Sequence, residues 1–307
     1  MPVFEVKRLR LLVELSRRGT IAAVAHALSF SPSAVSQQLS VLEREAGTRL
    51  LEPDGRRLRL TPEGELLVKH ATTVLAQLER AHADLASLRG DVTGTVKLAA
   101  FQSAILSLVL HAVTLMADGH PDCRFEVTEL ESETALPALA AGDFDLVLAE
   151  EYPGHPLPVI PGADLHELTT DPLELAVPTT WDEVTTLEAL ADRPLALEPH
   201  GTTSRTWATA LCRTTGFEPD IRYTSTDLQI HLRVVQEGLA AALLPGLAEA
   251  RHRDGVITHP LPGRPHRRIL TATRVGSREH PRIAATHQAL KTAAAGQTQR
   301  QTRRRLT

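Results

Sequence analysis

Short polar side chains recur along one face of a helix that the sequence predicts over residues 32–46. This face carries Ser33, Ser36, Gln37 and Ser40. The opposite face carries Val35, Leu39 and Leu42, so polar and apolar residues alternate with helical spacing. Hydroxyl and amide groups both donate and accept hydrogen bonds, which suits contact with base edges in the major groove of DNA. An ordinary amphipathic helix with a solvated polar face has the same pattern, so the neighbouring segments must decide.

A shorter helix is predicted directly before this one, and a tight break separates the two. Thr20 can cap the shorter helix, whose apolar residues recur at helical spacing over residues 21–28. Ser31 can cap the second helix, and Pro32 stands at its first position, where a missing N–H costs no hydrogen bond. Gly47 ends the second helix. The arrangement predicts a helix-turn-helix in which Thr20 and Pro32 join the polar face at the DNA.

A basic hairpin is predicted after the helix pair. Strands are expected over residues 49–52 and 57–60, joined by a turn over residues 53–56. The second strand reads Arg-Leu-Arg-Leu, which places its two arginines on one face. With Arg56 in the turn and Arg57 at the start of the strand, the tip is cationic and suits backbone phosphates. A solvated charged hairpin is the alternative.

A long helix is expected from Pro62 to Arg89, with Thr61 as its cap and an acid in its first turn. Its apolar residues are separated alternately by four and by three positions: Leu67, Ala71, Val74, Leu78, Ala81, Leu85 and Leu88. A seam of this kind, held for three heptads, predicts pairing with a second copy of the chain. The expected contacts of the dimer are Leu67, Val74, Leu78 and Leu85. Packing of the stripe on the chain's own body is the alternative.

Beyond this helix, residues 90–94 contain two glycines and are expected to form a hinge. Strands and helices then alternate, which predicts an α/β domain with a mostly parallel sheet. The expected strands cover residues 96–100, 124–129, 146–149, 173–177, 195–197, 221–223, 241–244 and 268–274. They divide into one unit of residues 95–170 with 268–295 and a second unit of residues 171–267. Residues 296–307, with four arginines and no acid, are expected to form a disordered basic tail.

The composition is ordinary for a globular protein, with 42% hydrophobic and 23% charged residues. No apolar run approaches the ~20 residues of a membrane span, and the N-terminus interleaves charged and apolar residues, unlike a signal peptide. Residues 1–60 carry 10 Lys and Arg against 6 Asp and Glu, whereas the rest of the chain carries 23 against 31. A mildly basic head on an acidic body predicts a cytoplasmic protein in which only the head meets nucleic acid.

No motif in the sequence supports catalysis or metal binding. A P-loop, a nucleophile elbow, a GxGxxG motif and a zinc-ligand cluster are all missing, and Cys123 and Cys212 alone exclude a disulfide scaffold. We therefore expect no catalytic residues, no metal and no cofactor. An enzyme or a transport-type binding protein built from the α/β units is one alternative class, and an architectural DNA binder without a ligand is another.

The residues from Leu9 to Gly64 resemble the N-terminal domain of LysR-type transcriptional regulators. The matching residues are Leu9, Leu12, Thr20, Ala23, Leu28, Ser31, Ala34, Val35, Ser36, Gln38, Leu39, Leu42, Glu43, Gly47, Leu50, Leu60, Thr61, Pro62 and Gly64. Two positions depart from the family's pattern: Pro32 stands where a base-contacting Gln is usual, and Pro53 where an Arg of the hairpin is usual. Looser phrases, ESETALPALAAGDFDLVLAE, DPLELAVP and VVQEGLAAALLP, extend the resemblance over nearly the whole chain.

The resemblance implies a mixed fold. An all-α winged helix-turn-helix head over residues 1–61 and a dimerisation helix over residues 62–89 would carry a two-lobed α/β effector-binding domain, similar to periplasmic solute-binding proteins. It implies a bacterial homodimer, more often a dimer of dimers (a homotetramer), on a two-fold promoter site in double-stranded DNA, with RNA polymerase as an open further partner and no membrane partner. A small-molecule effector of unknown identity would bind between the lobes and change the spacing of the heads.

Three predicted loops stand where ligands of open α/β sheets bind, beyond the carboxyl ends of strands and near helix N-termini. Their candidate effector-binding residues are Gln102, Ser103, Glu131, Ser132, Thr202 and Thr203. The hydroxyls and free N–H groups suit a small carboxylate or similar anion, and plain helix capping is the alternative reading of each hydroxyl. Glu131 favours instead a cation or an amine, so the sequence leaves the charge of the ligand open.

Overall fold

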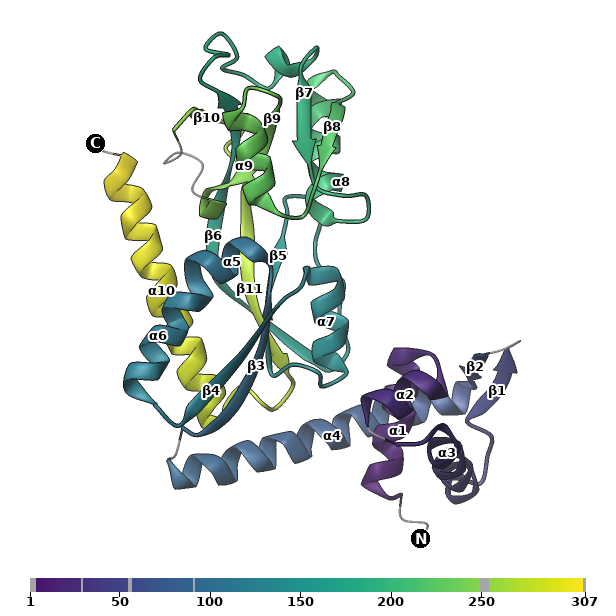
Figure 1. Ribbon diagram of the computed structural model, residues 1–307. Coiled ribbons are helices and arrows are strands. Elements are labelled where there is room, and N and C mark those ends of the chain that lie inside the picture. The colour runs from purple at the N-terminus through teal and green to yellow at the C-terminus, as the bar shows by residue number, and fades with distance from the viewer. Residues whose placement is uncertain (1–3, 29, 55–56, 91, 249–253, 306–307) are drawn as a thin grey trace.

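The structure is a computed structural model that describes residues 4–28, 30–54, 57–90, 92–248 and 254–305. A small helical head lies at one end of a long helix, and a two-lobed α/β domain lies at the other end (Figure 1). This arrangement is the predicted fold class.

The head consists of three helices, α1 (Val6–Arg18), α2 (Ile21–Ala27) and α3 (Pro32–Ala46). They pack around one apolar cluster, to which the hairpin and the start of the long helix also contribute. Its most deeply buried members include Leu11, Leu12, Val24, Val35, Leu42 and Leu50. Burial of these leucines and valines, at about 1.5–3 kcal/mol each, is what holds three short helices together.

The helix caps are those that the sequence predicts. The hydroxyl of Thr20 accepts a hydrogen bond from the N–H of Ala23 at 3.2 Å, and Ser31 accepts one from Ala34 at 3.2 Å. Gly47 ends α3 with a φ of 67°, a left-handed conformation that costs a residue with a Cβ more than it costs glycine. The break between α2 and α3 is therefore fixed by local chemistry.

The first strand of the hairpin lies two residues later in the chain than predicted. Strand β1 covers Leu51–Asp54 and pairs antiparallel with β2 (Arg57–Leu60), so Pro53 lies in the strand opposite Leu58 and not in the turn. The two-stranded ribbon has two free edges, and a proline is tolerated at an edge because its missing N–H breaks no pairing there. Residues 55–56 lie outside the described part of the chain.

Helix α4 (Pro62–Arg89) begins and ends at the predicted residues and starts against the hairpin. A Cβ at Gly64 would come within 2.2 Å of the carbonyl oxygen of Leu50, so only glycine allows this approach. The start of the heptad seam belongs to the head, because Ala71 is buried in the head core and Leu67 packs against it. The rest of the seam is exposed: Val74 by 42%, Leu78 by 40%, Leu85 by 60% and Leu88 by 85%.

Nine strands lie in the described part of the α/β domain. They are β3 (Gly94–Ala100), β4 (Cys123–Glu129), β5 (Leu146–Glu151), β6 (Ala163–Pro178), β7 (Pro194–Leu197), β8 (Asp220–Thr224), β9 (Ala241–Pro245), β10 (Val256–Pro260) and β11 (His266–Arg274). The sheet order is β4-β3-β5-β11-β6-β9-β7-β8, with β10 on β6. Strands β3, β4 and β5 are parallel in lobe I, and β7, β8 and β9 are parallel in lobe II.

Two antiparallel strands join the lobes. Strand β6 has 16 residues, which corresponds to about 50 Å of extended chain. Its first half pairs with β11 in lobe I and its second half pairs with β9 and β10 in lobe II. The prediction of a mostly parallel sheet is therefore wrong for the centre of the domain, where the crossing strands are antiparallel.

Helices cover both lobes. They are α5 (Gln102–Ala104), a π-helical turn (Ile105–Val109), α6 (Leu110–Gly119), α7 (Ser132–Ala140), α8 (Thr203–Thr215), α9 (Leu228–Gln236) and α10 (Pro281–Arg305). The segment Gln102–Gly119 is long and apolar enough to cross a membrane, with a mean hydropathy of 1.2. Leu108, Ala112 and Met116 are buried in the core of lobe I, however, and this packing accounts for the apolar composition.

The expectation of a disordered tail over residues 296–307 is wrong for most of that stretch, because α10 continues to Arg305. The chain from Gln297 to Arg305 contains neither glycine nor proline and is rich in Gln and Arg, which favour helices. Gly296 has no positive φ and so does not end the helix.

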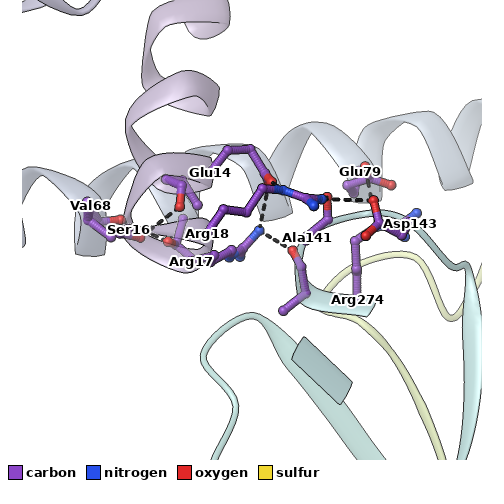
Figure 2. A network of polar contacts seen from close by, with 12 residues as sticks. Glu14, Ser16, Arg17, Arg18, Val68, Glu79, Ala141, Asp143 and Arg274 are labelled. Carbon is purple, nitrogen blue, oxygen red and sulfur yellow. Dashed lines mark hydrogen bonds and ion pairs between the residues drawn. The ribbon is translucent and has the colours of Figure 1, made fainter. Parts of the chain in front are cut away.

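The head touches lobe I through the C-terminal end of α1 (Figure 2). Arg18 lies 2.8 Å from the Asp143 carboxylate and 2.8 Å from Glu14 on its own helix. Arg17 donates to the carbonyl oxygen of Ala140, at the end of α7. A cavity of about 420 Å³ lies beside this contact, between α1, α4 and lobe I, away from the predicted ligand loops.

We expect Arg18→Asp to release the head from lobe I, because it brings a carboxylate to Asp143 in place of a guanidinium. An exposed ion pair contributes about 0.2–1 kcal/mol, so the released population should grow by up to roughly fivefold. Small-angle scattering would detect this as a larger radius of gyration at equal protein concentration. The charge-swapped variant Arg18→Asp with Asp143→Arg should return to the compact value. A radius that is equal in all three proteins would show that this ion pair does not hold the head.

Candidate nucleic-acid interface and ligand site

The polar face of α3 is open to solvent. Ser33, Ser36, Gln37 and Ser40 are all exposed. Val35, Leu39 and Leu42, on the opposite face, are exposed by no more than 2%. The core thus fixes the rotation of α3 and leaves hydroxyl and amide groups pointing outward. The exposed Pro32 opens α3, and Thr20 caps α2, so Thr20 serves the fold through its hydroxyl in addition to any contact with DNA.

Glu43 of α3 holds the hairpin against this helix, a role that its place in the sequence did not indicate. One carboxylate oxygen of Glu43 accepts from the N–H groups of Leu50 and Leu51, at 2.9 and 3.1 Å. At the ribbon itself, Arg59 is paired with Glu52, which reduces the positive charge available for phosphates. Arg57 begins β2, and Arg56 lies outside the described residues, so its predicted role stays a prediction.

A buried arginine occupies the boundary of the two lobes. Arg267 of β11 is exposed by only 2% and donates to Asp171 of β6 at 2.8 and 3.0 Å and to Glu150 of β5. It also donates to the hydroxyl of Ser103 at 2.8 Å, and its guanidinium lies 4.9 Å from the ring centre of Phe101. Burial by itself would lower the pKa of Arg267, but Glu150 and Asp171 raise it, so the charge is permanent.

The predicted ligand residues of lobe I are engaged with the protein. The Gln102 side chain reaches lobe II, where it donates to Asp227 at 2.8 Å and accepts from the N–H of Leu228 at 2.9 Å. The hydroxyl of Ser132 is buried and accepts from the N–H of Glu150 at 2.9 Å. Ser132 and Ser103 therefore support the boundary, and Gln102 bridges it.

The predicted anion position at the start of α8 is occupied by a carboxylate of the protein itself. Thr202 caps α8 by accepting from the N–H of Arg205 at 3.2 Å. Thr203 donates its N–H and its hydroxyl to one oxygen of Glu133, at 2.8 and 2.5 Å. Glu133 belongs to α7 of lobe I, so it crosses the boundary to the helix terminus where an anionic ligand would otherwise sit.

Two further carboxylates lie near this boundary and form no ion pair with the residues that the structure describes. Glu131 precedes α7 and is half-buried. Its burial, and to a smaller extent repulsion from Glu150, raises its pKa to about 7. Glu198 follows β7, and burial together with repulsion from Glu150 and Glu131 raises its pKa to about 8. The sequence pointed to Glu131 through its place after a strand, but it gave no sign that Glu198 and Arg267 would lie near it.

The two thiols are buried and remote from this chemistry. Cys212 of α8 is fully buried, and burial raises its pKa to about 11. Cys123 is 6% exposed, and burial raises its pKa as well. Within the described residues, no group of three or more His, Cys, Asp or Glu side chains is arranged to hold a metal ion.

Two family models match the chain and together cover most of it. Residues 6–65 match the bacterial regulatory helix-turn-helix protein of the lysR family, and residues 89–295 match the LysR substrate binding domain. Between the two matches lie residues 66–88, which belong to α4. Each match contains one of the two candidate sites described above.

Curated relatives and solved structures agree with these matches. The chain is 27% identical to the DNA-binding transcriptional dual regulator OxyR of Escherichia coli over 281 residues, which is 89% of this chain and 90% of that protein. It is 29% identical to a probable hydrogen peroxide-inducible genes activator of Mycobacterium avium over 288 residues, 85% of each chain.

Full-length structures share the fold at lower identity. An OxyR variant from Pseudomonas aeruginosa has a TM-score of 0.67 at 20% identity and covers 94% of this chain and 95% of its own. CbnR in complex with its target DNA has a TM-score of 0.54 at 22% identity and covers 95% of this chain and all of its own. The relatives are transcription regulators and not enzymes, and this chain belongs to the LysR family of DNA-binding transcription regulators.

Proposed function

We propose that this protein binds a two-fold site in double-stranded DNA as a homodimer or a dimer of dimers, and that a small molecule held between its lobes controls its action on a promoter. The observation that carries this proposal is the exposed row of hydroxyl and amide groups on α3, fixed by a fully apolar opposite face. The protein would act in the cytoplasm, where promoter DNA and RNA polymerase are found.

The reading of DNA is assigned to α3. Its exposed serines and glutamine would contact base edges, while the hairpin and the N-terminus of α3 would contact phosphates. Pro32 cannot make the side-chain hydrogen bond of a glutamine. Gln37 has a longer side chain than the three serines of this face, and its amide can both donate and accept. We therefore assign Gln37 the main role in base recognition.

Dimerisation is assigned to the exposed part of the α4 seam. Val74, Leu78 and Leu85 are exposed on one helix, and they recur at heptad spacing. An apolar stripe of this kind is favourable only when a partner covers it. A dimer would also present two α3 helices to two half-sites on DNA.

The similarity to proteins named as hydrogen peroxide-inducible activators suggests a second candidate function, a response to peroxide. A peroxide-reactive cysteine must be a thiolate and must be accessible. A pKa of about 11 leaves roughly 10⁻⁴ of the Cys212 thiol ionised at neutral pH, and Cys212 has no exposed surface. We therefore assign control to a bound ligand and not to thiol oxidation.

We expect Gln37→Ala to weaken binding to the protein's own operator by about 1–3 kcal/mol, or roughly 5- to 150-fold, because a bidentate contact with one base is lost. A protection footprint on the upstream DNA, followed by titration at two salt concentrations, measures both the site and the affinity. Gln288→Ala, which removes the same exposed side chain from α10 of lobe I, is the matched control and should bind as the parent does. Equal affinity of the Gln37 variant would remove α3 from base recognition.

We expect Leu78→Glu with Leu85→Glu to convert the dimer to a monomer, because it places carboxylates opposite each other in the seam. The dissociation constant of the dimer should rise by at least tenfold, as measured by sedimentation. Leu239→Glu, at a leucine exposed by 48% in lobe II, is the control and should stay dimeric. A monomeric parent protein, or an unaffected seam variant, would show that α4 is not the dimer contact.

We expect the thiols of the folded protein to react slowly with a disulfide reagent such as DTNB and to react fully only after unfolding. The footprint should be the same before and after treatment with hydrogen peroxide. Fast labelling in the folded state, or a footprint change that Cys212→Ala abolishes, would instead support the peroxide response.

A further inference from the structure

The lobe boundary holds more negative than positive charge that is free to meet a ligand. Arg267 is fully engaged by Glu150, Asp171 and Ser103. Arg205, the other buried arginine near this point, donates to the backbone carbonyl of Glu198 at 3.0 Å and forms no ion pair among the described residues. In the described part of the chain, neither guanidinium forms an ion pair with the carboxylate of Glu131 or Glu198, although the charge of Arg267 attracts Glu131.

The position that an anionic ligand would need is filled by the protein. Glu133 accepts both the N–H and the hydroxyl of Thr203 at the N-terminus of α8, so a protein carboxylate already uses these donors. The hydroxyls of Ser103 and Ser132 are also engaged, with Arg267 and with the N–H of Glu150. An anion would have to displace Glu133 and would then meet Glu131 and Glu198 nearby.

One buried oxygen is left without a partner at the same place. Glu198 is exposed by only 8%, and the hydroxyls of Thr202 and Ser204 interact with its carboxylate. Among the described residues, however, no donor has hydrogen-bonding geometry toward its Oε2 atom. A buried carboxylate oxygen without a donor is costly, because burial removes its water without replacement. Glu198 belongs to lobe II, whereas Glu131 and Glu150, which repel it, belong to lobe I. The unsatisfied acceptor therefore belongs to lobe II, and the carboxylates that repel its group belong to lobe I.

We propose that the effector is a small organic cation whose ammonium or guanidinium group binds between Glu198 of lobe II and Glu131 of lobe I. This inference rests on the proposed function, in which the ligand binds between the lobes. An ammonium brings three N–H donors and a guanidinium five, and Oε2 of Glu198 needs one of them. An organic cation fits better than a metal ion, because no group of three or more possible metal ligands gathers in the described part of the chain.

Binding of such a cation is linked to proton release. Repulsion and burial raise the pKa of Glu131 to about 7 and that of Glu198 to about 8, so both carry protons for part of the time near neutral pH. The charged groups that act on Glu131 are Glu129, Glu133, Glu150 and Arg267, and those that act on Glu198 are Glu150 and Glu131. The phenol of Tyr152 also faces Glu198. A cation prefers the ionised carboxylates. Its affinity should therefore rise with pH from about 6 to about 8 and level off above both pKa values.

The test compares amines with carboxylates of matched carbon skeleton. Agmatine, putrescine and butylamine are tested against succinate and butyrate by thermal shift and by calorimetry in phosphate and Tris buffers. We expect the amines alone to raise the melting temperature, with a heat that differs between the buffers because protons are released. Agmatine against putrescine distinguishes guanidinium from ammonium recognition. Stabilisation by the carboxylates alone, or by none of the compounds, would overturn the proposal.

Two isosteric variants assign the site. Glu198→Gln and Glu131→Gln should each weaken amine binding by at least tenfold and flatten its pH dependence. Neither should destabilise the free protein, because each removes a repelling charge. Glu183→Gln, at an exposed acid of lobe II that pairs with Arg193, is the control and should bind amines as the parent does. Unchanged amine affinity in both site variants would also overturn the proposal.

The DNA footprint separates this inference from the function on which it rests. An intact footprint in a protein that ignores amines would overturn the cationic effector and leave the regulator in place. Loss of any footprint in the parent protein would count against the proposed function itself.

Discussion

The guanidinium of Arg267 is the group around which the ligand-binding domain is arranged. It joins β11 to β5 through Glu150, to β6 through Asp171, and to α5 through Ser103. Asp171 also accepts from the N–H of Leu247, directly after β9 of lobe II. A charge exposed by 2% is tolerated only when every partner is present, since removal of one partner leaves the other charge buried and unpaired. The crossing strands are therefore fixed relative to each other at this point.

Helix α7 connects the two regions that the protein must couple. At its N-terminal end, Glu133 contacts Thr203 of lobe II. At its C-terminal end, the carbonyl oxygen of Ala140 accepts from Arg17 of the head. A helix of nine residues is short and rigid, so Glu133 and the carbonyl group of Ala140 are held in a fixed relation at its two ends. This contact network is spatial continuity, and only a measured coupling between ligand and DNA would make it a pathway.

The parts of the protein that could be predicted from sequence are those that depend on local chemistry. The caps Thr20 and Ser31, the bounds of α4 and the polar face of α3 follow from spacing along one helix. The ligand boundary does not, because its contacts join residues far apart in sequence: Arg267 lies 117 residues from Glu150 and 96 from Asp171. The sequence identified Ser103, Ser132 and Thr203 as hydroxyls near helix starts, but it did not indicate which donors the protein itself would use. The prediction of Pro53 in a turn was wrong because strand pairing outweighs the local preference of proline for turns. The prediction of a disordered tail was wrong because α10 continues past Gly296 to Arg305.

The charge of the ligand decides the direction in which the lobes would move. Gln102 with Asp227 and Glu133 with Thr203 bridge the boundary. An anion would compete with Glu133 for the same donors and would therefore favour separation of the lobes. A cation would offset the repulsion between Glu131 and Glu198, which belong to different lobes, and would favour their approach. A ligand shifts this equilibrium only by the difference in its affinity for the two arrangements. The carboxylates of Glu131 and Glu198 come together only when the two lobes are close, so a cation can contact both of them only in that arrangement. Their mutual repulsion opposes the approach of the lobes, and a bound cation removes this repulsion. The same two acids therefore make closure of the lobes selective for a positively charged ligand.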